Sequence, residues 1–176
     1  MHKEISLVTT VYNGEKYIEK SVRSILNQTF EDFEYLIIDD GSTDNALEKL
    51  QQINDSRIRI IQQNNQGQTN ALINGIKQAN GELIARLDAD DYSLPNRLMH
   101  QAEFMHSHPK VPLCGSRIEE LHNENLIPQR IQFASTDNEI EKIICCFNPF
   151  AHSAVMFRRD AYFKVGGYDN NYKIGM

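Results

Sequence analysis

The sequence predicts an α/β protein with a mainly parallel sheet flanked by helices. Over residues 1–87, strand-like and helix-like segments alternate at the spacing of βα units. Some of the strand-like segments, such as 34–39, are continuous apolar runs, which are typical of strands buried on both faces. Polar residues follow several of these strands, and open α/β sheets bind ligands beyond the carboxyl ends of their strands. The sequence therefore predicts a ligand site at one edge of the sheet.

Local patterns predict the elements of the first half. Strands are expected over 5–10, 34–39, 58–61 and 83–87. Asn13-Gly14 turns the chain into a first helix, whose apolar stripe comprises Ile18, Val22, Ile25 and Leu26. Residues 42–44 offer N-caps for a second helix, and a third is expected over about 68–79. Asn80-Gly81 is expected to close the third helix with a left-handed residue.

The second half is expected to extend the same domain. Pro95-Asn96 opens a helix, and strands are expected over 111–115 and 153–157. Between these strands the pattern predicts a hairpin or loop tip at 123–125 and a short helix over 137–145. Residues 166–169 mark a turn. No repeat or linker interrupts the sequence, so we expect a single domain over 1–176.

Composition excludes several classes of protein. A formal charge of −6 and a pI near 5.5 argue against binding to nucleic acid, which needs clustered Lys and Arg. The longest apolar runs are only strand-sized and residues 1–4 lack a signal-peptide core, so no membrane span is expected, and a cytoplasmic location is expected. The three cysteines, Cys114, Cys145 and Cys146, lack C-x-x-C spacing and are expected to be buried thiols.

Three carboxylates lie within four residues at Asp88, Asp90 and Asp91, directly after a predicted strand. Adjacent carboxylates repel one another unless a cation shares them, and such oxygen ligands suit Mg²⁺ or Mn²⁺ bound together with substrate phosphates. The alternative is a solvated acidic turn that caps a helix. Two further polar groups, 10–13 and 39–44, follow other strands of the same predicted sheet. We therefore expect all three groups to converge on one ligand.

Five ordered blocks together resemble the family 2 glycosyltransferases, nucleotide-sugar-dependent enzymes of the Rossmann-like GT-A fold. The resemblance covers nearly the whole chain and rests on Thr10-Val11-Tyr12-Asn13-Gly14, Ser24-Ile25-Leu26-Asn27-Gln28-Thr29, Ile38-Asp39-Asp40-Gly41-Ser42-Thr43-Asp44, Leu87-Asp88-Ala89-Asp90-Asp91 and Val165-Gly166-Gly167-Tyr168. It implies one GT-A-type domain with the nucleotide-binding part first, over 1–91. The acceptor-side part would begin within 92–176.

The resemblance also implies roles for individual residues. Thr10 and Tyr12 would line the base pocket, with the Tyr12 ring against the nucleobase and Asn13 beside them. Asp40 would accept a hydrogen bond from a uracil-type ring nitrogen, and an ordinary helix-capping role is the alternative. Asp88 and Asp90 would contact ribose and metal, and Asp91 would coordinate the metal with Asp90. Spacing alone leaves open which of the three carboxylates binds the ion directly.

The chain departs from the family pattern at two places. An arginine that faces the diphosphate in many relatives is replaced by Leu72, so Arg86 or, preferably, Arg97 would substitute for it. In the family, a Glu-Asp pair after the Gly-Gly-Tyr block supplies the catalytic base. We expect this chain to be the amino-terminal part of a longer enzyme, with the base beyond Met176. His152 falls where relatives approach the acceptor, and a buried structural histidine is the equal alternative.

The expected reaction is inverting transfer of a sugar from a nucleotide-diphospho-sugar, with a UDP-sugar preferred, to a saccharide or lipid-linked saccharide acceptor. The resemblance implies surface-polysaccharide synthesis, in the cytoplasm or at the inner face of the membrane. Without its base the chain would bind nucleotide and metal but turn over poorly. A nicotinamide-dependent enzyme is disfavoured because the first strand leads into Val11-Tyr12-Asn13-Gly14 and not into G-x-G-x-x-G. A non-catalytic nucleotide-sugar-binding or interaction module remains the alternative.

Overall fold

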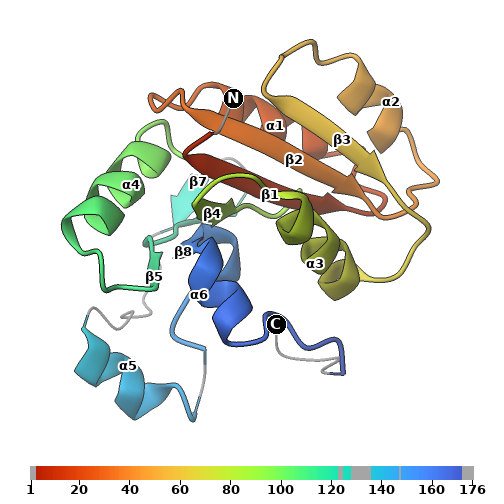
Figure 1. The fold of residues 1–176 in the computed structure, drawn as a ribbon. Coiled ribbons are helices and arrows are strands. Elements are labelled where there is room, and N and C mark those ends of the chain that lie inside the picture. Colours follow the sequence, from red (N-terminus) through yellow and green to blue (C-terminus); the bar gives the residue numbers. More distant parts are fainter. Residues whose placement is uncertain (1–2, 123–124, 128–135, 147, 172–176) are drawn as a thin grey trace.

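A six-stranded sheet organises the protein (Figure 1). The computed structural model describes residues 3–122, 125–127, 136–146 and 148–171. The strand order is β3-β2-β1-β4-β8-β5, with bounds β1 Ile5–Val11, β2 Phe33–Asp39, β3 Ile58–Gln62, β4 Leu83–Arg86, β5 Leu113–Gly115 and β8 Val155–Arg158. The first four strands pair in parallel, and β8 is antiparallel to both β4 and β5. The mainly parallel α/β sheet predicted from the sequence is confirmed, with β8 as its reversed strand.

Helices cover both faces of the sheet (Figure 1). One face packs against α1 (Ile18–Leu26), α2 (Ala46–Gln51) and α4 (Arg97–Ser107). The other packs against α3 (Gln68–Gln78), while Tyr162 of the short helix α6 (Arg159–Lys164) extends this layer over β8. The apolar stripe predicted for the first helix is confirmed for Ile18, Val22 and Ile25, which are fully buried.

Alternate residues of the central strands feed two separate cores, as the two-residue period of a strand requires. In β1, Ile5, Leu7 and Val11 join the core beneath α1, α2 and α4, whereas Val8 joins the core beneath α3. The same alternation in β2 sends Tyr35 to the first core and Leu36 to the second. The continuous apolar run of β2 therefore reflects burial on both faces, and the sheet is a rigid platform for the loops at its edge.

The remaining elements lie after α4. Strands β6 (Glu120–His122) and β7 (Asn125–Ile127) form an antiparallel pair, consistent with the predicted hairpin, although residues 123–124 at its tip lie outside the described part. Helix α5 (Asp137–Ile143) begins with a capping box in which Thr136 and Glu139 satisfy each other's backbone N–H groups. A 3₁₀ turn, η1 (His152–Ala154), leads directly into β8.

The end of α3 differs from the expectation. Neither Asn80 nor Gly81 has a positive φ, and the chain leaves the helix at Ala79 in an extended conformation. Gly81 is needed for a different reason, because a Cβ at this position would lie 2.5 Å from the backbone nitrogen of Ser6. Glycine here permits close approach of the connection to β1.

Two further expectations concern the cysteines and the membrane. Cys145 and Cys146 are exposed, and only Cys114 is partly buried, so the prediction of three buried thiols is wrong for the adjacent pair. The reason is that they follow α5, which has no buried residue. Among the helices that the structure describes, none combines the length and apolarity needed to cross a bilayer.

Candidate nucleotide-binding site

The three predicted polar groups lie together at the edge of the sheet where β1, β2 and β4 end. The loops after β1 and β2 are joined by hydrogen bonds: the Asn13 backbone N–H donates to Ser42 Oγ at 3.0 Å, and the Thr43 N–H donates to Asn13 Oδ1 at 2.7 Å. The third loop is also close, because a Cβ on Gly14 would lie 3.8 Å from the Cβ of Ala89. The predicted convergence of the three groups is therefore present in the fold.

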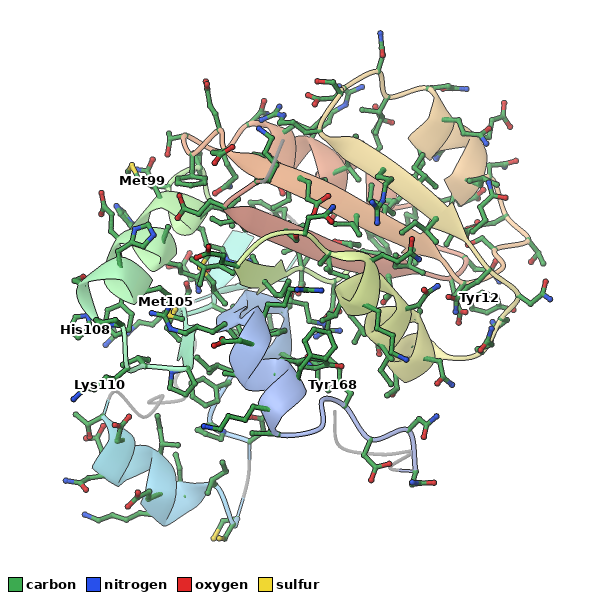
Figure 2. All side chains as sticks on the ribbon, viewed as in Figure 1. Tyr12, Met99, Met105, His108, Lys110 and Tyr168 are labelled. Carbon is green, nitrogen blue, oxygen red and sulfur yellow. The ribbon has the colours of Figure 1, made fainter. Side chains whose placement is uncertain are left out.

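The first loop presents an aromatic ring to solvent. Tyr12 is 53% exposed, and Figure 2 shows it at the loop end of the sheet. Asn13 adopts a left-handed conformation with φ of 55°, which turns the chain toward the loop after β2, where its side-chain oxygen is held by Thr43. Thr10 is only 8% exposed at the end of β1. Tyr12 is thus free to stack on a planar ligand, and Asn13 fixes the loop that carries it.

Asp40 lies at the end of β2, is only 2% exposed and is surrounded by hydrogen-bond donors. Its Oδ1 accepts from Gln63 Nε2 at 2.7 Å and from the Gln66 N–H at 3.0 Å, and its Oδ2 accepts from the Gly67 N–H at 2.8 Å. The carboxylate therefore shapes the loop between β3 and α3. Asp40 does not perform its alternative role from the sequence, a helix cap at α2: the N-cap residue of that helix is Asn45, which makes no side-chain capping bond, and the Ala46 N–H donates to Asp44 Oδ1 at 3.0 Å.

The acidic loop after β4 is held through Asp88. Its backbone N–H donates to Ser153 Oγ at 3.0 Å and its carbonyl accepts from Ser21 Oγ at 3.2 Å. Its carboxylate accepts from Arg86 Nη2 at 2.8 Å and from Gln68 Nε2 at 3.3 Å. Serines from α1 and η1 therefore clamp the peptide of Asp88 from two sides.

The three carboxylates of the acidic loop differ in exposure: Asp88 is partly buried, and Asp90 and Asp91 are exposed. Burial raises the pKa of Asp88, the positive charge of Arg86 opposes the rise, and the carboxylates of Asp91 and Asp90 add to it. The loop therefore offers two solvent-facing carboxylates beside a third that is already hydrogen-bonded.

The donor set fits a hard divalent cation that shares its shell with a ligand. Within the described residues, no three His, Cys, Asp or Glu side chains are arranged to enclose a metal by themselves. Mg²⁺ and Mn²⁺ are commonly held by one or two carboxylates and completed by phosphate oxygens and water. The exposed oxygens of Asp90 and Asp91 match that pattern, and they leave the rest of the shell to a diphosphate.

The two arginines near the acidic loop have different roles. Arg97 donates to the carbonyls of Arg86, at 2.6 Å, and Val155, at 3.2 Å, and burial lowers its pKa to about 10. These bonds tie β4 to β8, so the preference for Arg97 as the cation facing phosphate is wrong. Arg86 is 1% exposed, and its Nε and Nη1 have no hydrogen-bond partner among the described residues.

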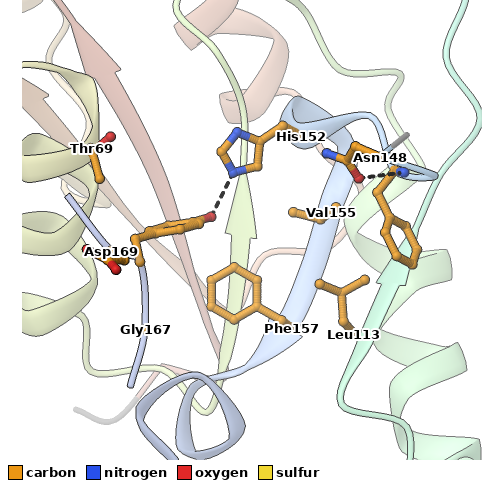
Figure 3. A pocket seen from close by; sticks show the side chains of 10 residues that line it. Thr69, Leu113, Asn148, His152, Val155, Phe157, Gly167 and Asp169 are labelled. Atoms are coloured by element: carbon orange, nitrogen blue, oxygen red, sulfur yellow. Dashed lines mark hydrogen bonds between the residues drawn. The ribbon is translucent and has the colours of Figure 1, made fainter. Parts of the chain in front are cut away.

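A pocket of about 350 Å³ lies beside η1 and is shown in Figure 3. His152 Nε2 lies 2.8 Å from the hydroxyl of Tyr168 at its wall. Burial and then the charge of Arg86 lower the pKa of His152 to about 4, so the ring is neutral near pH 7. His152 is half-buried with a hydrogen-bond partner and also borders a pocket, and its place near an acceptor stays a prediction.

Several supporting residues could not be predicted. The clamp of Asp88 uses Ser21 and Ser153, which lie 67 and 65 residues from it in the sequence. Gln63 is a second example, since it contacts Asp40 across 23 residues. The only local sign of such a role was that Ser21 lies three residues after Ile18, which places it on the buried stripe of α1.

Comparison with known proteins identifies the sequence family. The sequence model described as Glycosyl transferase family 2 matches residues 6–166. The O-antigen biosynthesis glycosyltransferase WbnJ of Escherichia coli is 32% identical over 169 residues, which cover 93% of this chain and 65% of WbnJ. An uncharacterised glycosyltransferase of Haemophilus influenzae is 31% identical over 169 residues, covering 90% of this chain and 52% of that protein. The chain thus spans about half to two-thirds of the length of these relatives.

Solved structures share the fold. The crystal structure of S. aureus TarS in complex with UDP-GlcNAc has a TM-score of 0.76 and 26% identity, and the match covers 93% of this chain and 47% of that one. The mannosyltransferase PcManGT from Pyrobaculum calidifontis, in complex with GDP-Man and Mn²⁺, has a TM-score of 0.70 and 16% identity. That match covers 96% of this chain and 48% of PcManGT.

Proposed function

The chain belongs to glycosyl transferase family 2, and from this premise we propose that it acts in metal-dependent, inverting transfer of a sugar from a nucleoside-diphosphate sugar to an acceptor hydroxyl. The observation that carries the proposal is the meeting of three loops at one sheet edge, one with an exposed Tyr12, one anchored by Asp40 and one with three carboxylates. An aromatic face, a carboxylate acceptor and a divalent-cation site are the groups that a nucleoside diphosphate needs.

The donor is proposed to bind with its base against Tyr12, near Thr10 and Asn13, and with its ribose near Asp88 and Asp90. Two solved structures of similar fold support a nucleotide-sugar donor, because that of TarS is in complex with UDP-GlcNAc and that of PcManGT is in complex with GDP-Man and Mn²⁺. A UDP-sugar is the preferred donor. Asp90 and Asp91 would hold Mg²⁺ or Mn²⁺, whose positive charge would stabilise the departing diphosphate.

In the proposed reaction the acceptor oxygen forms a bond to the anomeric carbon on the face opposite the diphosphate, and the bond from that carbon to the phosphate oxygen breaks. The acceptor proton passes to a general base, and the nucleoside diphosphate leaves with the bonding electron pair. His152 would stand near the acceptor, but a pKa of about 4 makes it a weak proton acceptor. We place the base outside the residues that the structure describes.

The acceptor is proposed to be a saccharide or lipid-linked saccharide in the synthesis of a surface polysaccharide. Two relatives support this setting by name, the O-antigen enzyme WbnJ and the amylovoran biosynthesis glycosyltransferase AmsE of Erwinia amylovora, which is 28% identical over 171 residues. The proposal rests on these relatives, because a fold alone does not determine which acceptor an enzyme uses.

Thermal unfolding with added ligands tests the proposal, because a ligand that binds the native state raises the melting temperature. UDP, GDP and NAD are added separately, each with Mn²⁺ and each with EDTA. We expect UDP or GDP to raise the melting temperature with Mn²⁺ and to have little effect with EDTA. A shift with NAD alone would contradict the proposal. No shift with any nucleotide would favour the alternative of an interaction module without donor binding.

A further inference from the structure

Helix α1 holds the end of the acidic loop as well as its beginning. The loop spans residues 88–93. Ser21 Oγ donates to the carbonyl of Asp88 at 3.2 Å, where the loop begins. Three residues further along α1, Ser24 Oγ accepts from the N–H of Ser93 at 2.9 Å, where the loop ends. Because residues three apart lie on the same side of a helix, one side of α1 reaches both ends of the loop.

Gln28 extends this attachment by one further turn of α1. Its Nε2 donates to the carbonyl of Leu94 at 2.8 Å, and its Oε1 accepts from the N–H of Leu98 at 3.0 Å, in the first turn of α4. Gln28 and Ser93 are each only 5% exposed, so water has little access to these bonds and competes poorly for them. We call Ser21, Ser24 and Gln28 the polar stripe of α1.

Between its two attached ends the acidic loop is short and turns back on itself. Only residues 89–92 lie between Asp88 and Ser93, and the N–H of Asp91 donates to the carbonyl of Asp88 at 3.2 Å. Asp90 and Asp91 therefore lie on a tight turn whose ends are both fixed. Their backbone can shift little unless the bonds to α1 break.

The freedom of such ligands to move affects which divalent cation they prefer. Mg²⁺ needs nearly ideal octahedral geometry with oxygens at about 2.0–2.1 Å, whereas Ca²⁺ takes about six to eight oxygens at about 2.3–2.6 Å in flexible arrangements. Ligands that can move apart accommodate the larger shell of Ca²⁺, and ligands that are held in place accommodate it less well. The attachment of the loop to α1 therefore bears on the choice of metal.

We propose that the polar stripe of α1 makes the metal site selective for Mg²⁺ over Ca²⁺, because it fixes both ends of the loop that carries Asp90 and Asp91. Ser21, Ser24 and Gln28 are positioning residues, since they act through the backbone of this loop. Residues 24–29 are one of the five blocks that carry the family resemblance, and the proposal gives two of them a role that the sequence alone did not indicate. The inference rests on the proposed function.

The test measures the affinity of UDP and of GDP by calorimetry, in separate titrations with Mg²⁺, with Ca²⁺ and with EDTA. Ser24→Ala removes the acceptor for the N–H of Ser93, and Ser24→Thr keeps a hydroxyl at that place. Gln28→Met removes the hydrogen bonds of the amide with little change in size. Val22→Ala is the control, because it opens a cavity in the core beneath the same helix and leaves the bonds to the loop in place. Circular dichroism of each variant checks that it is folded.

We expect the wild-type protein to bind nucleotide more tightly with Mg²⁺ than with Ca²⁺, and weakly with EDTA. In Ser24→Ala and Gln28→Met the affinity with Mg²⁺ should fall by about 10- to 100-fold, which is the usual effect of removing hydrogen bonds that orient metal ligands. The affinity with Ca²⁺ should fall less, so the ratio of the two affinities decreases. Ser24→Thr should restore the wild-type ratio. Val22→Ala should keep this ratio, although urea should unfold it at a lower concentration.

Three results would overturn the inference while leaving the proposed function in place. The first is a wild-type protein that binds nucleotide equally well with Mg²⁺ and with Ca²⁺. The second is an unchanged ratio of the two affinities in both Ser24→Ala and Gln28→Met. The third is the same decrease of the ratio in Val22→Ala, which would show that loss of stability is the cause. Nucleotide binding that needs no divalent cation, or no nucleotide binding at all, would instead contradict the proposed function.

Discussion

The backbone N–H of Asp88 donates to the side-chain oxygen of Ser153 at 3.0 Å, and this bond joins the acidic loop to the turn before the one reversed strand of the sheet. Asp88 belongs to the nucleotide-binding part that the family resemblance implies over 1–91, and Ser153 belongs to the part after it. The placement of the carboxylates therefore depends on both parts of the chain. A donor site built only from the βα units would lack this support.

Replacing Ser153 with alanine should loosen the acidic loop. The substitution leaves the N–H of Asp88 without its acceptor, and we expect a loss of about 1–3 kcal/mol in the free energy of unfolding, measured by urea denaturation. Mn²⁺-dependent UDP binding should also weaken. Ser56→Ala, at an exposed serine, is the control and should change neither quantity. Unaltered stability and binding in Ser153→Ala would show that the bond is dispensable.

Replacing Asp91 with alanine should remove metal-dependent binding while leaving the fold intact, because Asp91 is exposed. In the wild-type protein, nucleotide at about 100 times its dissociation constant should add about 2.7 kcal/mol of stability with Mn²⁺. We expect most of this gain to disappear in Asp91→Ala, as measured by thermal unfolding with and without Mn²⁺. Glu103→Ala removes an exposed negative charge from α4 and should keep the full gain. An undiminished gain in Asp91→Ala would contradict its role as a metal ligand.

Replacing Tyr12 with alanine should weaken nucleotide binding through the loss of base stacking. Stacking of a base on an aromatic ring contributes about 1–3 kcal/mol, so UDP affinity should fall by a factor of about 5 to 150, as measured by calorimetry. Tyr12→Phe keeps the ring and should retain most of the affinity. Tyr17→Ala, at a similarly exposed tyrosine, should have little effect. Equal losses in Tyr12→Ala and Tyr17→Ala would argue against a specific stacking position.

The sequence was most informative where function depends on neighbours along the chain. Helix α1 could be predicted because its apolar residues repeat with the helical period, and strand β2 because its continuous apolar run is typical of a strand buried on both faces. The three polar groups could be placed together because parallel strands bring their carboxyl ends to one edge. Such inferences need only local periodicity and the geometry of a βα unit.

The sequence was least informative where a side chain depends on a partner far along the chain. The sequence favoured Arg97 as the cation that faces phosphate. Its hydrogen bonds to the carbonyls of Arg86 and Val155 could not be predicted from the sequence. The same holds for Gln63, whose role is set by Asp40 and Asn74. Asp40 and Asp88 were found by their motifs, but the residues that hold them were not.

The stability of the protein should depend on His152 at acidic pH. Burial lowers the pKa of His152 from 6.5 to about 4 in the folded protein, so between these values the unfolded chain binds a proton that the folded chain does not. The neutral ring therefore contributes stability that is fully present above pH 6.5 and is lost as pH falls toward 4. His152→Phe removes this titration and should flatten the pH dependence of the free energy of unfolding across that window, as measured by urea denaturation at each pH. His100→Phe replaces an exposed histidine of α4 and should leave the slope unchanged. If wild type and His152→Phe lose stability in parallel as the pH falls, the surroundings of His152 do not hold its ring neutral. In that case His152 could again be considered as the group that takes the proton from the acceptor hydroxyl.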